Sequence, residues 1–170
     1  MIFLLTLQMF PGIMLLIPYY VLLVNLRMIN TLQGLVLPNI AFSMPFCTWM
    51  MMGYFNTIPR ELEQAAMIDG CSRSQYFIRV ILPIATPGIS ATAIYASILA
   101  WNEYMFALTL QTDERMKTLT VGIAQMIGEY RVMWNDLMAG GLLASLPLII
   151  AFLFFQKQFI STLTAGAVKG

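Results

Sequence analysis

The chain has 170 residues, of which 59% are hydrophobic and only 10% are charged. Soluble domains carry roughly 25% charged side chains, so this composition excludes an ordinary water-soluble protein, and we expect most of the surface to face lipid. There is no histidine, which excludes His-based catalytic triads and zinc sites, and we expect no catalytic residue, metal or cofactor. The net charge of +1 argues against nucleic acid as a partner.

Long uncharged runs predict where the chain crosses a membrane. A hydrocarbon core about 30 Å thick requires roughly 20 helical residues. Four runs satisfy this length, and the expected spans are residues 2–24, 35–55, 86–110 and 137–157. The sequence therefore predicts an all-α, polytopic membrane protein in which residues 1–170 belong to a single domain.

The first apolar run follows Met1 directly, and the first cation is Arg27. A cleavable signal peptide would carry basic residues before its apolar part, so this interpretation is disfavoured. The pattern is typical of a chain that begins inside a helix. Our hypothesis is that the chain lacks upstream spans.

The segment 57–83, between the second and third spans, is expected to form two short helices joined by a tight turn. Pro59 and Glu63 favour the start of the first helix, and Gly70 is expected to end it. Leu62, Ala65 and Ala66 are expected to share a small apolar face that fits a groove in another protein. By spacing alone, an amphipathic connector on the membrane surface is the favoured interpretation.

The second short helix is expected to begin at Ser72, because Ser72 followed by Gln75 is typical of a capping box. Its apolar residues continue to Pro83 and Pro87, which are expected to break it. The predicted unit is therefore a helix, a turn and a helix that stops where the next span begins.

The same segment resembles the EAA loop of binding-protein-dependent ABC importer permeases, in which Glu-Ala-Ala, three residues, Gly, nine residues and Ile-x-Leu-Pro follow one another. Here the pattern reads Gln64-Ala65-Ala66, Gly70, Val80 and Leu82-Pro83, and its spacing fits throughout. Gln64 replaces the family's glutamate, and the adjacent Glu63 lies about 100° around the helix. The resemblance implies that an ATPase is contacted by Glu63, Gln64, Ala65, Ala66, Asp69, Gly70, Leu82 and Pro83.

Two further motifs point to the carbohydrate-uptake branch of this family. Trp101-Asn102-Glu103-Tyr104 resembles the WNE(F/Y) segment in the penultimate span of sugar permeases, and residues 163–170, LTAGAVKG, resemble the end of the maltose-type second permease subunit. Members of the family usually have six spans. The resemblance therefore implies a type I ABC importer transmembrane domain with about four of those spans present.

Glu103 is the one acidic residue within the predicted spans. A carboxylate at mid-bilayer costs on the order of 2.5 to 3.5 kcal/mol, so it is expected to face protein or water. With Trp101, Asn102 and Tyr104 it either lines the route of a sugar or contacts a partner subunit. The sequence leaves both interpretations open.

The resemblance implies an ATP-driven sugar importer in a prokaryotic cell membrane, in which this chain forms half of the pathway. Its implied partners are a dimer of ATPase subunits, a second permease subunit and an extracytoplasmic solute-binding protein, besides the carbohydrate substrate and the lipid bilayer. Segment 57–83 would be cytoplasmic and loop 111–136 external. The chain contains no G-x-x-x-x-G-K-[ST] phosphate loop, so ATP hydrolysis is expected in another polypeptide.

The alternative is a secondary transporter or a channel subunit. Such a protein should place more ionisable groups at membrane depth, because ion coupling requires them. A membrane enzyme is a third and weaker alternative, since the sequence has no G-x-S-x-G motif and no paired carboxylates within its spans.

Overall fold

The computed structural model describes residues 6, 11–128 and 130–167, with side chains as far as Phe154. In this part of the chain the regular structure is helical and there is no strand; a lone antiparallel bridge joins Ile127 and Val132. The prediction of an all-α fold is confirmed.

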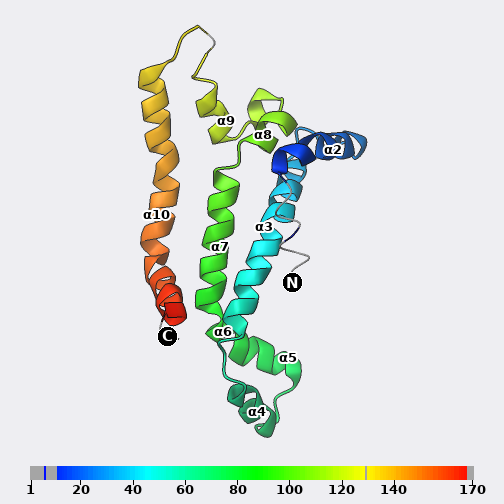
Figure 1. Cartoon of the computed structure of the whole chain (residues 1–170), viewed down its shortest axis with the longest axis vertical. Helices are drawn as coiled ribbons and strands as arrows, with labels where there is room; N and C mark the ends of the chain where they lie inside the picture. The colour runs from blue at the N-terminus through cyan, green and yellow to red at the C-terminus, as the bar shows by residue number, and fades with distance from the viewer. Residues whose placement is uncertain (1–5, 7–10, 129, 168–170) are drawn as a thin grey trace. The chain divides into compact units, whose positions relative to one another are not determined.

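The helices carry the labels of Figure 1. A π-helical turn at Phe77–Ile81 links α5 to α6, and a 3-10 turn occupies Glu114–Met116. The α-helices are α2 (Gly12–Asn25), α3 (Leu32–Phe55), α4 (Glu61–Ile68), α5 (Arg73–Tyr76), α6 (Leu82–Ile84), α7 (Thr86–Trp101), α8 (Met105–Leu110), α9 (Leu119–Ala124) and α10 (Trp134–Ala167).

Two of the described helices are long and apolar enough to cross a bilayer unaided: α3, and α10 over Trp134–Phe154. A third crossing results if Arg73–Ile84 and Thr86–Trp101 form one broken span. α2 is apolar but has only 14 residues, and residues 2–5 and 7–10 of the predicted first span lie outside the described residues. The arrangement of four spans stays a prediction.

The helix expected over residues 86–110 is interrupted. α7 ends at Trp101, and a separate helix, α8, begins at Met105. Asn102 and Glu103 are the polar residues at this break, but apolar residues resume directly after them, so hydropathy averaged over a span favours a continuous helix. The cause is Glu103, whose carboxylate binds backbone amides of α8, as described below.

The expected stop at Pro83 is also displaced. The helical run that begins at Arg73 continues through Pro83 to Ile84, and the chain then bends by 68° into α7. Immediately before Pro83 the helix widens into the π turn, in which the Leu82 N–H donates to the Phe77 carbonyl. A proline ring crowds the carbonyl four residues before it, and the wider turn upstream relieves this contact.

The chain divides into two compact units, one formed by Met1–Pro45 and Ala96–Ala151, the other by Phe46–Tyr95 and Phe152–Gly170. In the first unit α8 packs against α2 (Figure 1), and the buried centre consists of Leu23, Phe106 and Leu110. The Phe106 ring lies edge-on to Tyr19, with a centroid distance of 5.7 Å. Burial of large apolar and aromatic groups thus fixes the position of α8.

A polar junction in the first unit joins the turn before α3 to the residues that follow α8. The Asn30 side-chain oxygen accepts from the backbone amides of Thr112 (2.6 Å) and Asp113 (2.9 Å). The buried Gln111 donates from its side-chain nitrogen to the Thr31 carbonyl at 2.7 Å. These bonds provide hydrogen-bond partners for backbone N–H and C=O groups that lie between helices.

In the second unit α3 and α7 approach closely at Gly88. A Cβ atom on Gly88 would lie 2.5 Å from the ring of Tyr54. Further along the same helices, the rings of Phe46 and Tyr95 are 4.3 Å apart between centroids. The absence of a side chain at Gly88 therefore permits the aromatic side chain of α3 to pack on the backbone of α7.

Gly34 allows the N-terminal turn of α3 to form. A Cβ atom at this position would lie 2.1 Å from the Met28 carbonyl oxygen, and the Gly34 amide donates to the Thr31 hydroxyl at 3.0 Å. We expect Gly34→Ala to lower the thermal stability of the purified protein, measured by heating and fluorescence-detected size exclusion. Gly141→Ala is the matched control, because its Cβ meets nothing within 4 Å and alanine favours helix. Equal stabilities of the two variants would contradict this account.

Candidate functional site

The segment that resembles an EAA loop folds as the two short helices α4 and α5 (Figure 1). α4 ends in a pair of bonds that closes its last turn: Gly70 N–H to the Met67 carbonyl (3.1 Å) and Cys71 N–H to the Ala66 carbonyl (2.9 Å). Gly70 has φ +78°, in the left-handed region that favours glycine. The prediction that Gly70 ends this helix is confirmed, and its role is conformational.

The predicted capping box at the start of α5 is confirmed. The Ser72 hydroxyl accepts from the Gln75 amide at 3.3 Å, and the Ser72 amide donates to the Gln75 side-chain oxygen at 2.9 Å. The hydrogen-bonded end of α4 at Gly70 is followed directly by the capping box at Ser72. The backbone of the turn between the two helices therefore has little conformational freedom. The α4–α5 unit is therefore stiffly connected although it is small.

The predicted ATPase-contact residues are mostly exposed, namely Glu63, Gln64, Ala65, Asp69, Gly70, Leu82 and Pro83. Ala66 is the exception, with 7% of its surface exposed. The expectation that Ala65 and Ala66 share one face is wrong: consecutive helical residues point about 100° apart, and only Ala66 is directed inward.

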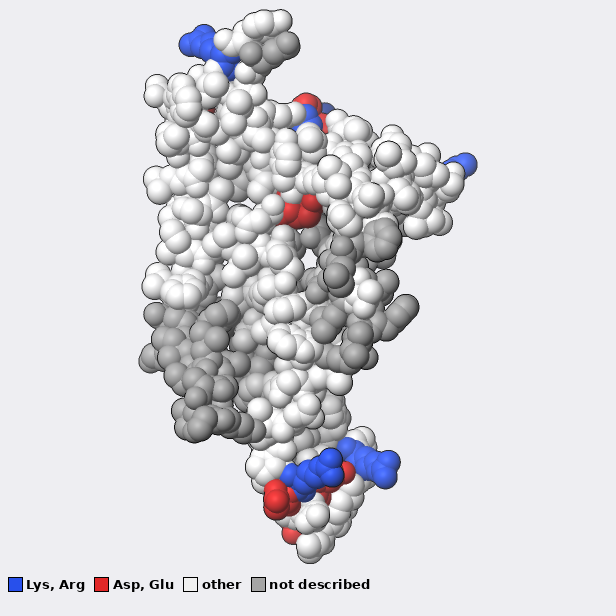
Figure 2. Space-filling view, in the orientation of Figure 1, with Lys and Arg blue, Asp and Glu red and all other residues white. Residues whose placement is uncertain are grey.

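The free surface of this segment combines charge with apolar groups. Figure 2 shows acidic and basic side chains gathered over α4 and α5. Beside them Ile68 is 86% exposed, and Met67, Phe77 and Ile78 are exposed as well. Exposed apolar side chains rimmed by charge are typical of protein-binding surfaces.

A hollow of about 260 Å³ lies where the chain enters α4. Glu63 borders this hollow together with Arg60, whereas Gln64 does not. The two side chains thus face different surroundings, which argues against Glu63 replacing a glutamate at position 64. The full lining is Phe55, Asn56, Ile58, Pro59, Arg60, Glu63, Tyr76 and Ile81.

Glu103, a candidate for the sugar pathway or a subunit contact, joins two helices of its own chain. Its carboxylate oxygens accept from the amides of Phe106 (2.7 Å) and Ala107 (2.8 Å) in the first turn of α8. Its backbone carbonyl accepts from the Thr120 hydroxyl at 2.9 Å. Helix N-termini have free N–H groups and a positive dipole end, and both favour a carboxylate here.

The neighbouring residues also make local bonds. The Trp101 indole N–H donates to the Ala144 carbonyl of α10 at 3.1 Å, and the Asn102 side chain donates to the Ile98 carbonyl at 2.8 Å. Tyr104 is 42% exposed. The predicted group Trp101 to Tyr104 is therefore a junction between helices, in which Glu103 is half-buried and the other three residues are exposed.

A cavity of about 220 Å³ in the first unit borders this junction. Its polar side chains are already engaged: Asn39 donates to the Leu35 carbonyl (2.9 Å), and Ser43 to the Asn39 carbonyl (2.8 Å). The lining is Gly12, Asn39, Phe42, Ser43, Leu99, Glu103, Met105 and Phe106. No group of three His, Cys, Asp or Glu that could hold a metal occurs among the described residues.

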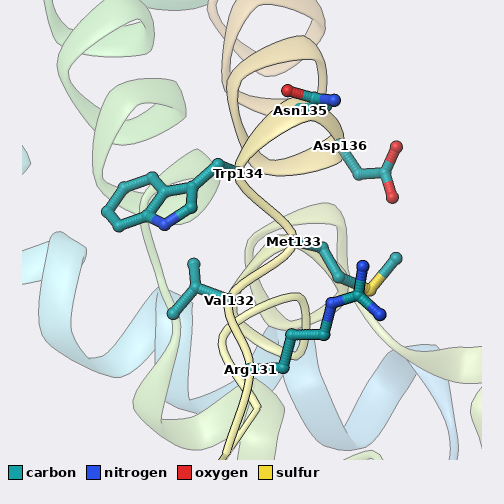
Figure 3. A pocket seen from close by; sticks show the side chains of 6 residues that line it. All are labelled: Arg131, Val132, Met133, Trp134, Asn135 and Asp136. Atoms are coloured by element: carbon teal, nitrogen blue, oxygen red, sulfur yellow. The ribbon is translucent and has the colours of Figure 1, made fainter.

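The predicted external loop contains α9 and a short hairpin closed by the Ile127–Val132 bridge. Tyr130, near the tip of the hairpin, is 94% exposed. A hollow of about 470 Å³ follows at the start of α10, with Trp134 and Val132 on one side of the chain and Arg131 and Asp136 on the other (Figure 3). The loop thus presents aromatic, apolar and charged groups together. Its hollow is lined by Arg131, Val132, Met133, Trp134, Asn135 and Asp136.

Sequence reasoning missed Asn30 and Tyr54, which make the long-range hydrogen bonds described for their units. A tyrosine or asparagine near the end of an apolar run gives no signal of its partner. A weak sign was available at Asn30, which has φ +57°, because asparagine tolerates the left-handed region better than most residues.

The fold and the α4–α5 segment define an α-helical membrane protein with a short charged segment between apolar helices. The chain belongs to the family described as binding-protein-dependent transport system inner membrane component, which matches residues 1–164. The predicted resemblance to this family is confirmed.

The chain is similar to permease proteins of sugar transport systems. It is 42% identical, over 99% of its length, to the trehalose/maltose transport system permease protein of Thermococcus litoralis. It is 36% identical, over 96% of its length, to the diacetylchitobiose uptake system permease protein of Streptomyces coelicolor, and 36% identical, over 98% of its length, to the trehalose transport system permease protein of Mycobacterium tuberculosis. The chain spans 61%, 59% and 61% of these relatives.

Glu103→Gln is expected to destabilise the junction at α8. Glutamine retains one acceptor oxygen for two amides, and loss of one charge-assisted bond costs about 2 kcal/mol. We expect a lower melting temperature for the purified protein, again measured by heating and fluorescence-detected size exclusion. Glu114→Gln is the control, since Glu114 pairs with Lys117 at the surface, where such pairs contribute little. A Glu103→Gln protein as stable as the control would contradict the capping role.

Proposed function

We propose that this chain is the permease subunit of an ATP-driven sugar importer and forms half of its translocation pathway. Membership of the family and the sugar-permease names of the relatives support this function. The observation that carries the proposal is the α4–α5 unit, which keeps the spacing of the EAA pattern and exposes most of the residues that the pattern assigns to ATPase contact. The test is ATP-dependent sugar uptake by the complete complex reconstituted in vesicles.

The α4–α5 unit is proposed to couple the membrane helices to a separate ATPase. Two properties suit it to this task. Its turn is closed by the Gly70 bonds and the Ser72 capping box, so it can transmit force without changing shape. Its exposed Ile68 and surrounding charges provide apolar area and specificity for a groove. The chain itself hydrolyses nothing in this scheme.

The remaining partners follow from the family. A second permease subunit would complete the pathway, and a solute-binding protein would deliver the carbohydrate on the external side. Loop 111–136 is the proposed docking element for that protein, because its hairpin exposes Tyr130 and its hollow combines Trp134 with Arg131 and Asp136. The proposed location is the cell membrane of a prokaryote, which the chain crosses several times.

A secondary transporter or channel subunit is the alternative function. In the described part of the chain, Glu103 is the carboxylate at the junction between α7 and α8, and it already caps α8. This leaves no free carboxylate there for ion coupling. Uptake that continues without ATP and stops when ionophores collapse the ion gradient would favour the alternative.

Ala65→Asp is expected to detach the ATPase. Ala65 is exposed on α4, and a carboxylate placed in a docking contact must lose its water shell. We expect loss of ATPase co-purification and of substrate-stimulated hydrolysis, while the protein still inserts in the membrane. Gln125→Asp adds a charge at an exposed position outside the assigned ATPase-contact residues and should leave ATPase co-purification unchanged. Full co-purification with Ala65→Asp would reject the assigned contact.

Cys71 reports the side of the membrane on which the α4–α5 unit lies. It is half-buried in this unit, and Cys47→Ser removes the second cysteine of the chain. We expect a membrane-impermeant maleimide to label Cys71 in inside-out vesicles and not in intact cells. The control carries Cys47→Ser, Cys71→Ser and Gln125→Cys, which should label from the outside. Labelling of Cys71 in intact cells would overturn the cytoplasmic assignment.

A further inference from the structure

Tyr54 links the two chain segments that flank the α4–α5 unit. It lies one residue before the end of α3, and its hydroxyl donates to the Ile84 carbonyl at 3.1 Å, 30 residues along the chain. Ile84 is the last residue of α6, where a helix end leaves carbonyls without intrahelical partners. The residues between them, 55–83, include the whole unit that resembles an EAA loop.

The same side chain contacts the helix beyond the bend. Gly88, in the first turn of α7, is buried, and a Cβ atom there would lie 2.5 Å from the Tyr54 ring. Between Ile84 and Gly88 the chain turns by 68° at Ala85, which is fully buried. Tyr54 therefore contacts both sides of the bend, by its hydroxyl on one side and its ring on the other.

We propose that Tyr54 is a positioning residue that makes α3 and α7 move together when the α4–α5 unit is displaced. A hinge at the bend would otherwise let α6 tilt while α7 stays in place, and the displacement would be absorbed there. The ring and hydroxyl of Tyr54 resist such independent tilting of α6, because they hold both Ile84 and Gly88 to the end of α3. This inference rests on the proposed function, since it concerns how ATPase movement reaches the membrane helices.

Two substitutions test the two contacts. Tyr54→Phe removes the hydroxyl and keeps the ring. Gly88→Ala retains the tyrosine but displaces its ring, since the new Cβ would overlap it, and this displacement also moves the hydroxyl relative to Ile84. The matched controls are Tyr95→Phe, which removes a hydroxyl from a ring stacked on Phe46, and Gly53→Ala, whose Cβ meets nothing within 4 Å.

The measurement is sugar taken up per ATP hydrolysed by the complete importer in vesicles, with assembly checked by co-purification. Loss of one hydrogen bond of about 1 kcal/mol corresponds to roughly a fivefold change in an equilibrium. We expect Tyr54→Phe and Gly88→Ala to lower the ratio by about that factor while hydrolysis and assembly persist. The two controls should keep the ratio of the unmodified importer.

Unchanged ratios in both variants would overturn the inference and leave the proposed function intact. Loss of assembly in Tyr54→Phe would also overturn it, because the residue would then serve folding and not coupling. If the unmodified importer takes up no sugar with ATP, the proposed function is rejected and this inference with it. A purely structural role would lower stability without changing the ratio of uptake to hydrolysis.

Discussion

Satisfaction of backbone hydrogen bonds is the constraint on which this structure depends. Inside a bilayer an unpaired N–H or C=O group has no water to bind, so each interruption of a helix needs a specific partner. The chain supplies one at each of two breaks. At the start of α8 the partner is the Glu103 carboxylate, and at the bend before α7 it is the Tyr54 hydroxyl on the Ile84 carbonyl. At both breaks, a polar side chain therefore bonds backbone groups at a helix end.

Three glycines serve three different physical purposes. Gly70 adopts a left-handed conformation that ends α4. A side chain at Gly34 would clash with the Met28 carbonyl oxygen, and a side chain at Gly88 would clash with the Tyr54 ring. Only the first is a matter of local backbone conformation. The other two depend on atoms contributed from elsewhere, and at Gly88 those atoms belong to a different helix.

Under the proposed function, the chain is a mechanical component of a larger complex. Many polar side chains in the described region complete helix ends and turns, and on the face shown in Figure 2 acidic and basic side chains gather over the α4–α5 unit. Family membership agrees with this interpretation, because a permease moves a solute without changing its covalent structure. In the proposed coupling role, the closed turn of the α4–α5 unit and the Tyr54 contacts on both sides of the 68° bend act in the same direction, since both limit the loss of displacement between this unit and α7.

The sequence by itself determined the class of protein, the helical content, the family and the two helix ends around Gly70 and Ser72, because hydropathy, spacing and capping are local properties. It did not reveal the break at Glu103, the inward direction of Ala66 or the contacts of Tyr54. Only the tertiary structure decided these. A continuous apolar pattern is compatible with a straight or a broken helix, and the choice depends on partners many residues away.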